Sequence, residues 1–218
     1  MVAMFTRNTL VLLALIAMIA LGALASGLAA VTGAAATPVA TPIVAMSADE
    51  AIAAITADDG TLRFDVSEDA TRFVFAPQPV HDDGMPAYGN GFVTQGFIYP
   101  EGTLDGTNGV LADGSPEFPD QVLGEWTCRG WFVGDGAHTT TGAWVITTQQ
   151  YNFGGEVGDA TLITEGYEIA DLNVPSERAI SGGTGPYVAA TGAGEQTLLG
   201  FNASEGVVLR FELTVQGG

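Results

Sequence analysis

The stretch Val207-Val-Leu-Arg-Phe-Glu-Leu-Thr-Val215 decides the fold class of this chain. Its odd positions are all apolar, while Arg210, Glu212 and Thr214 alternate with them. Successive side chains of a β-strand point to opposite faces, so this period of two predicts a strand with one buried and one wet face. The stretch 61–66 repeats the pattern with apolar residues at its even positions. Both stretches therefore predict strands that pack one face on a core.

Similar runs of β-branched and aromatic residues, separated by Gly, Asp, Asn and Pro, fill the rest of the body. The further predicted strands are 71–75, 92–99, 123–133, 139–153, 161–169, 179–181 and 190–201. Because no helical repeat of the kind that joins parallel strands lies between them, we expect antiparallel meander connections. The residues 61–218 are thus predicted to form one all-β domain, a sandwich or a barrel.

A long stretch rich in Gly and Asp, Glu101 to Asp120, interrupts these strands and predicts a loop. A loop of this length at a barrel mouth or sandwich end commonly carries ligand contacts. The alternative is a cluster of solvated turns.

The first 36 residues have the form of a secretory leader. Arg7 precedes the apolar run Leu10 to Leu24, and small residues with Ala-x-Ala sites ending at Ala25 or Ala36 follow it. This order predicts a cleaved signal peptide. Residues 10–31 are also long enough to remain as a membrane anchor. Both alternatives place the body outside the cytoplasm, secreted or, with the leader retained, in the cell envelope.

Residues 37–60 are predicted to connect the leader to the body. The Thr-Pro repeats of 37–44 disfavour helix and predict an extended tether, because each Pro holds the preceding residue in an extended conformation. Ser47-Ala-Asp-Glu50 matches a capping box and predicts a short helix through Ala51 to Ile55.

The charge of the chain excludes two classes of partner. There are 25 acidic residues against 6 basic ones, and all six are Arg, for a formal net charge of −19. Affinity for nucleic acid or for anionic lipid depends on clustered Lys and Arg. We therefore expect no nucleic-acid partner, and no membrane contact beyond the leader.

The predicted strand 123–133 carries the most chemistry, and its two faces differ. One face holds Glu125, Thr127, Arg129 and Trp131, and the other holds Trp126, Cys128 and Phe132. If the first faces the lumen, its charged groups need cross-strand partners, for which Glu165 and Tyr167 are candidates. Together with Trp131 they would form a set that orients a ligand. The alternative is an outward face with a salt bridge at the rim.

Other candidate sites are weaker. His81-Asp82-Asp83 has the composition of a metal site but supplies too few ligands, so we expect a solvated turn and no metal. Cys128 is the only cysteine and is expected to be a buried thiol beside Trp126, or else an intermolecular bridge. The sequence has no Gly-x-Ser-x-Gly elbow, so nothing favours a nucleophilic hydrolase.

The segment Ala179 to Gly194 resembles the signature of the dirigent and allene oxide cyclase superfamily. In that family a strand runs into Gly-Gly-Thr/Ser-Gly, an aromatic residue follows, and a small residue and a Gly precede the next strand. The matching residues here are Gly182, Gly183, Thr184, Gly185, Tyr187, Ala190 and Gly192. Consecutive glycines permit a tight reversal, which we expect Tyr187 to plug.

The resemblance implies an eight-stranded antiparallel barrel, commonly assembled as a homotrimer, that works without metal or organic cofactor. Relatives of this type close a ring in an unstable fatty-acid epoxide or orient phenoxy radicals that couple inside the barrel. The basic residue that dirigent proteins place before the glycine turn aligns with Ser176, and Arg178 follows on the same strand face. Asp171 lies in the loop that corresponds to the family's acidic mouth.

Three functions compete on these observations. The leading hypothesis is an exported barrel that binds a small apolar molecule in its lumen and guides a cofactor-free cyclisation or coupling. The alternatives are a non-catalytic envelope or surface module, whose interior is filled by side chains, and a lipocalin-like carrier, which binds without turnover.

Overall fold

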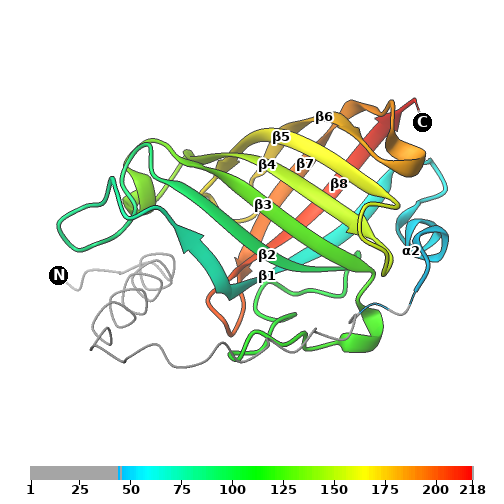
Figure 1. Cartoon of the computed structure of the whole chain (residues 1–218), viewed down its shortest axis with the longest axis horizontal. Coiled ribbons are helices and arrows are strands. Elements are labelled where there is room, and N and C mark those ends of the chain that lie inside the picture. Colours follow the sequence, from blue (N-terminus) through cyan, green and yellow to red (C-terminus); the bar gives the residue numbers. More distant parts are fainter. Residues whose placement is uncertain (1–43, 45, 218) are drawn as a thin grey trace, which may run out of the picture.

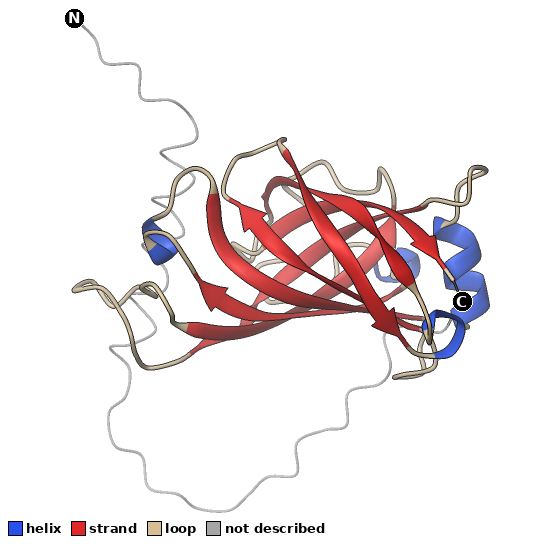
Figure 2. Cartoon of the chain, turned by 90° about the horizontal axis from the view of Figure 1, so that it is seen from above, coloured by secondary structure: helices blue, strands red, loops and turns tan. Residues whose placement is uncertain are grey.

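Eight antiparallel strands close into one barrel in sequence order (Figure 1), which confirms the predicted fold class. The computed structural model describes Val44 and residues 46–217, so the leader and most of the tether lie outside the described residues. The strands are β1 (Leu62–Phe75), β2 (Gly91–Pro100), β3 (Gly124–Phe132), β4 (Ala143–Phe153), β5 (Thr161–Ile169), β6 (Pro175–Gly183), β7 (Thr191–Phe201) and β8 (Val207–Gln216). Figure 2 shows them crossing the barrel at a tilt.

The strands differ from the predicted runs at three places. The runs 61–66 and 71–75 are the two ends of one long strand, β1. The short run 179–181 extends to the nine residues of β6. Strand β4 begins only at Ala143, because the 3-10 turn η2 (Gly136–His138) occupies the start of the predicted run.

Inward-facing side chains of the strands fill one end of the barrel with aromatic rings. Phe64 of β1 stacks on Phe211 of β8 with ring centroids 5.2 Å apart, and its edge contacts Tyr151 at 5.1 Å. All three are fully buried, as are Leu209 and Leu213 of β8. The predicted inward face of the stretch 207–215 is therefore correct.

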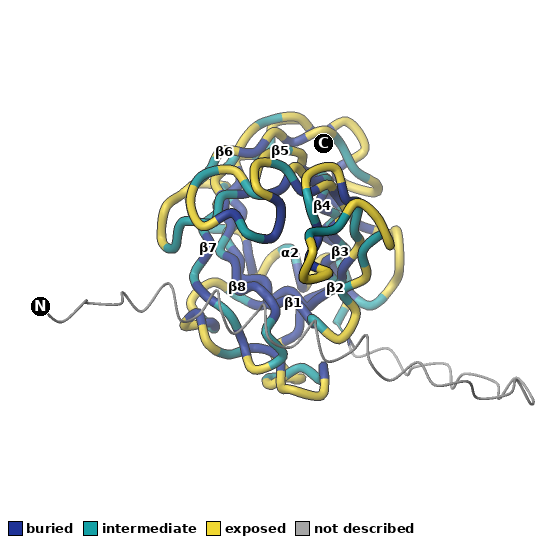
Figure 3. Tube along the Cα trace, turned by 90° about the vertical axis from the view of Figure 1, so that its left-hand side faces the viewer, coloured by how far each residue is buried: buried dark blue, intermediate teal, exposed yellow. Residues whose placement is uncertain are grey.

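Helix α2 (Ala48–Ile55) closes one end of the barrel. The predicted capping box forms: the Ser47 N–H donates to the Glu50 carboxylate at 3.0 Å, and the Glu50 N–H donates to the Ser47 hydroxyl at 3.4 Å. Ala51 and Ile55 then pack into the barrel core. Figure 3 looks into the barrel from the opposite end and shows α2 behind the ring of strands.

The glycine turn lies at this same closed end, between β6 and β7. Tyr187 is buried there and contacts Phe153 with ring centroids 5.9 Å apart. At Gly183 of β6 an added Cβ would clash with the carbonyl oxygen of Thr161 in β5. The close approach of β5 and β6 therefore requires glycine at this position.

The loop 101–121 covers the outer wall of the barrel. The Asp65 carboxylate, on the outer side of β1, accepts the N–H groups of Gly102 and Leu104 at 2.8 and 3.0 Å. The Tyr99 hydroxyl donates to the Gly109 carbonyl at 2.6 Å. This loop is therefore neither a free mouth loop nor a solvated cluster, although Ala112 reaches the rim of the cavity described below.

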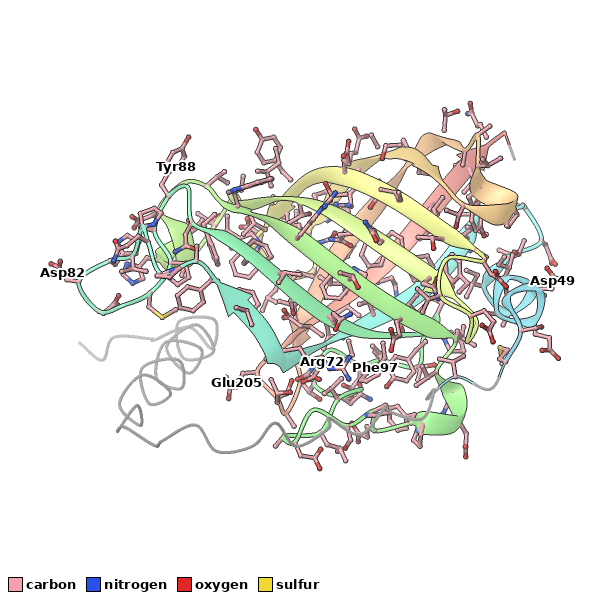
Figure 4. All side chains as sticks on the ribbon, viewed as in Figure 1. Asp49, Arg72, Asp82, Tyr88, Phe97 and Glu205 are labelled. Carbon is pink, nitrogen blue, oxygen red and sulfur yellow. The ribbon has the colours of Figure 1, made fainter. Side chains whose placement is uncertain are left out.

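The loops β1–β2 and β3–β4 meet at the open end. The rings of His81 and His138 stack with centroids 4.1 Å apart, and His138 Nε2 lies 2.9 Å from an Asp83 carboxylate oxygen. Figure 4 labels Asp82 at the outer tip of these loops and Asp49 at the opposite end of the molecule. In the described part of the chain, no three side chains of metal-ligating type are placed to share an ion. Of the helices in that part, none is long and apolar enough to cross a membrane.

Candidate ligand-binding site in the barrel lumen

A cavity of about 450 Å³ lies inside the barrel, and residues of the β1–β2 and β3–β4 loops are part of its lining. This volume lies in the range of small-molecule sites. Its walls are mainly aromatic, formed by Phe73, Phe75, Phe92, Trp126, Phe132 and Trp144. Polar side chains also line it, among them Glu68, Thr94, Cys128 and Glu168. The arrangement is an apolar chamber with a few convergent polar groups.

An irregularity in β1 determines which side chains face this chamber. Between the pairs Asp69↔Gln95 and Val74↔Val93, β1 advances by five residues while β2 advances by two. Because these two advances differ by an odd number of residues, the side chains of β1 that face inward change from even to odd positions. Before the irregularity the even residues face inward, through Glu68 to Ala70, and after it Phe73 and Phe75 face inward. One strand thereby supplies both a carboxyl group and an aromatic wall.

Glu68 is buried and bonded at both oxygens. The Thr94 hydroxyl donates to Oε1 at 2.6 Å, and the Val207 N–H donates to Oε2 at 2.8 Å. Burial, opposed in part by these two hydrogen bonds, raises the pKa of Glu68 to about 7, and the nearby charges of Glu168 and Asp69 add to the rise. Near neutral pH this carboxyl group can therefore release or accept a proton.

Glu168 has a different environment, because a positive charge compensates it. Arg178 Nη1 lies 3.9 Å from Glu168 Oε1, and both side chains are buried. The Thr147 hydroxyl bridges them, accepting from Arg178 Nη2 at 3.0 Å and donating to Glu168 at 2.7 Å. Side-chain amides of Gln149 and Gln196 donate to the two carboxylate oxygens at 2.8 and 3.0 Å. Glu168 is thus held in a fixed position by hydrogen bonds to both of its oxygens.

The same network fixes the neighbouring wall of the cavity. Trp126 Nε1 and the Tyr151 hydroxyl both donate to Gln149 Oε1, at 2.9 and 2.8 Å. The Cys128 thiol points to Glu168 Oε1 at 3.7 Å, and burial holds its pKa well above the ordinary range. Cys128 is a buried neutral thiol, as predicted.

The residues proposed from the sequence to orient a ligand do not line the lumen. Glu125 is half-buried, while Arg129, Trp131, Glu165 and Tyr167 are exposed on the outer face of β3 and β5. The expectation of an inward face is wrong because Trp126, Cys128 and Phe132 fill the inside of β3. Of the two alternatives for this strand, the outward one is correct.

Of the residues that line or support the site, the sequence singles out Arg178 but not Glu68, Thr94, Gln149, Glu168 and Gln196. Two of them were within reach of the alternation rule. The series Leu62, Phe64, Val66 continues to Glu68 on the same face of its strand. In the same way, every second residue from Leu162 onward leads to Glu168. Arg178 lies inward, on the strand face that it shares with Ser176.

Comparison with known proteins relates the barrel to solved structures only, since no protein-family model and no curated protein sequence matches the chain. A pterocarpan synthase dirigent protein superposes with a TM-score of 0.50 at 16% identity, covering 72% of this chain and 94% of its own. The chain has the fold of a dirigent protein.

Two further structures are similar to this dirigent-type barrel at lower scores. A second pterocarpan synthase dirigent protein gives a TM-score of 0.49 at 16% identity, covering 72% of this chain and 85% of its own. The Diels–Alderase of Streptomyces koyangensis gives 0.42 at 10% identity, covering 72% and 68%. The superposition on the first dirigent protein, at 16% identity, shows the fold alone, so the chemistry of this barrel depends on its own side chains.

Proposed function

We propose that this protein binds a small apolar molecule in the barrel lumen and guides a cofactor-free cyclisation or coupling of that molecule. The observation that carries the proposal is the aromatic chamber with Glu68 on its lining, bonded to Thr94 and titrating near neutrality. The fold shared with a pterocarpan synthase dirigent protein supports a ring-forming reaction.

The two carboxyl groups have separate roles in this proposal. Glu68 donates its proton to a heteroatom of the bound molecule, and the Thr94 hydroxyl and Val207 N–H stabilise the carboxylate that remains. It recovers a proton when the ring closes, so a cyclisation that only rearranges bonds leaves the proton count unchanged. Glu168, fixed by Arg178 and the two Gln side chains, adds a smaller contribution to the rise that burial gives the pKa of Glu68.

The experiment combines mass measurement with turnover. Protein purified from its own exporting host is examined by native mass spectrometry for a retained small molecule, and the released compound is then added back to fresh protein. We expect a reproducible extra mass and formation of a product. With the ligand at a saturating concentration, Glu68→Gln should lose at least 100-fold in turnover, because the amide cannot exchange the proton.

A pair of matched variants tests whether the cavity is the site. Ala70→Trp places an indole in the chamber and should abolish binding, whereas Ala179→Trp places one on the outer face of β6 and should not. Binding without turnover in the wild type would instead identify a carrier. A bare protein that takes up no apolar probe would identify a structural module.

The proposal includes export and self-association. Cleavage after Ala25 or Ala36 would release the barrel outside the cytoplasm, and the N-terminal mass of protein from the host tests it. The resemblance to dirigent proteins supports a homotrimer. The exposed cross-strand row Trp131, Ile146, Tyr167 on the outer wall supplies an apolar surface for the contact between copies.

A further inference from the structure

We propose that the lumen selects apolar ligands that carry a positively charged nitrogen, such as a protonated arylalkylamine, over neutral and anionic ligands of the same shape. This inference rests on the proposed function, since it names the class of molecule that the cavity binds. Four features of the cavity support it: the charges of its lining, the hydrogen bonds of Glu68, the aromatic walls and the charge of the whole chain.

The charges that line the cavity are all negative. They belong to Glu68, Glu168 and Glu205, and no Lys, Arg or His is found among its described lining residues. Arg178 lies behind Glu168, where its guanidinium donates to Thr147 and Thr164. It compensates the charge of Glu168 and leaves Glu68 without a counter-ion. An anionic ligand would meet only like charges in this chamber.

The hydrogen bonds of Glu68 are those of a carboxylate. Each of its oxygens already accepts a bond from a fixed donor, Thr94 or the Val207 N–H. The two donors favour the charged form of Glu68, and burial opposes it. No described cation forms an ion pair with Glu68 that would offset the effect of burial. A ligand cation placed in the cavity would supply the charge that this site lacks.

The walls suit a cation for a second reason. Phe73 stacks on Phe92 with centroids 5.3 Å apart, and Phe92 meets Phe132 at 5.2 Å. With Trp144, which also lines the cavity, these rings present π-surfaces on several sides. Aromatic faces attract ammonium groups, and more strongly when water is excluded.

The charge of the whole chain acts in the same direction. A formal net charge of −19 raises the local concentration of cations and repels anions before any contact forms. Glu205, in the loop between β7 and β8, also lines the cavity and adds to this field.

Three probes with one ring system test the selection: 1-naphthylmethylamine, which is cationic between pH 6 and 8, neutral 1-naphthalenemethanol and anionic 1-naphthoate. Binding is followed by calorimetry and by quenching of tryptophan fluorescence. We expect the amine to bind at least tenfold more tightly than the alcohol at pH 8, and the naphthoate at least tenfold more weakly. The preference for the amine should shrink at pH 6, where Glu68 is protonated.

Two variants locate the effect. Glu68→Gln should bring the affinities of the amine and the alcohol within about twofold of each other, because the amide cannot become a counter-ion. The matched control Glu165→Gln, on the outer face of β5, should leave the preference unchanged. The wild-type pH series remains decisive if Glu68→Gln fails to fold.

The outcomes separate the inference from the proposed function. If the alcohol and the amine bind wild-type protein equally at pH 8, the charge selection is wrong while lumenal binding stands. If the preference survives in Glu68→Gln, the counter-ion assignment is wrong. If none of the three probes binds and Ala70→Trp changes nothing, the proposed function itself fails.

Discussion

Glu68 links the chemistry of the lumen to the stability of the barrel. Its pKa rises from 4.5 to about 7 on folding, so the native state binds more protons than the unfolded state between these values. Its contribution is therefore fully present below pH 4.5 and is lost as the pH rises through 7. We expect Glu68 to cost about 2–3 kcal/mol of unfolding free energy between pH 5 and pH 8.

Urea unfolding at pH 5 and pH 8 measures this cost. The difference between the two pH values should be about 2–3 kcal/mol smaller in Glu68→Gln than in the wild type. Equal pH dependence in both proteins would show that Glu68 is not buried as an acid.

The buried pair Arg178 and Glu168 gives a second prediction for single residues. Removing the guanidinium in Arg178→Met leaves the Glu168 carboxylate buried without compensation and should destabilise the fold by about 3 kcal/mol. The double variant Arg178→Met/Glu168→Gln removes both charges and should recover part of this loss in urea unfolding. A double variant less stable than the single one would contradict the pairing.

At the scale of an element, the loop 101–121 depends on one carboxylate of β1. Asp65 accepts two loop N–H groups and pairs with Arg210, whose Nε lies 2.8 Å from Oδ1. Asp65→Asn should destabilise the protein by about 2 kcal/mol, because these bonds to a charged group weaken together. It should also speed hydrogen exchange at the amides of Gly102 and Leu104.

The control for this prediction lies in the same loop. The Asp105 carboxylate bonds only to Thr107, two residues away, and is exposed. Asp105→Asn should therefore leave exchange at Gly102 unchanged. Equal effects of the two substitutions would mean that Asp65 does not hold the loop on the wall.

The strands also show how far the sequence could be read. Alternation predicted the strands, and the capping box predicted α2, because both signals are local. Alternation does not say which face of β3 points inward, since both of its faces carry large side chains. The irregularity in β1 reverses the parity at Thr71 to Phe73, where the sequence carries no glycine or proline to mark it. The site depends on these two long-range facts, so its residues were mostly missed.

At the scale of the whole molecule, the outer wall yields a prediction about assembly. Trp131, Ile146 and Tyr167 form one exposed row across β3, β4 and β5, with 57%, 38% and 53% of their surface accessible. If this row is the contact between copies, Trp131→Ser/Tyr167→Ser should convert a trimer into monomers in native mass spectrometry. Tyr88→Ser, in the β1–β2 loop where the Tyr88 side chain is 70% exposed (Figure 4), should not. A wild-type monomer would contradict the proposed assembly.

Helix α2 affects how molecules can enter and leave the barrel. Ala51 and Ile55 pack into one end of the barrel, and no residue of α2 is among the described residues that line the cavity, so the cavity does not run through that end. A reactant and its product would then have to pass through the same opening of the cavity, one after the other. A product that binds the chamber tightly would block the next reactant. Product release, rather than the chemical step, would then limit the rate of turnover.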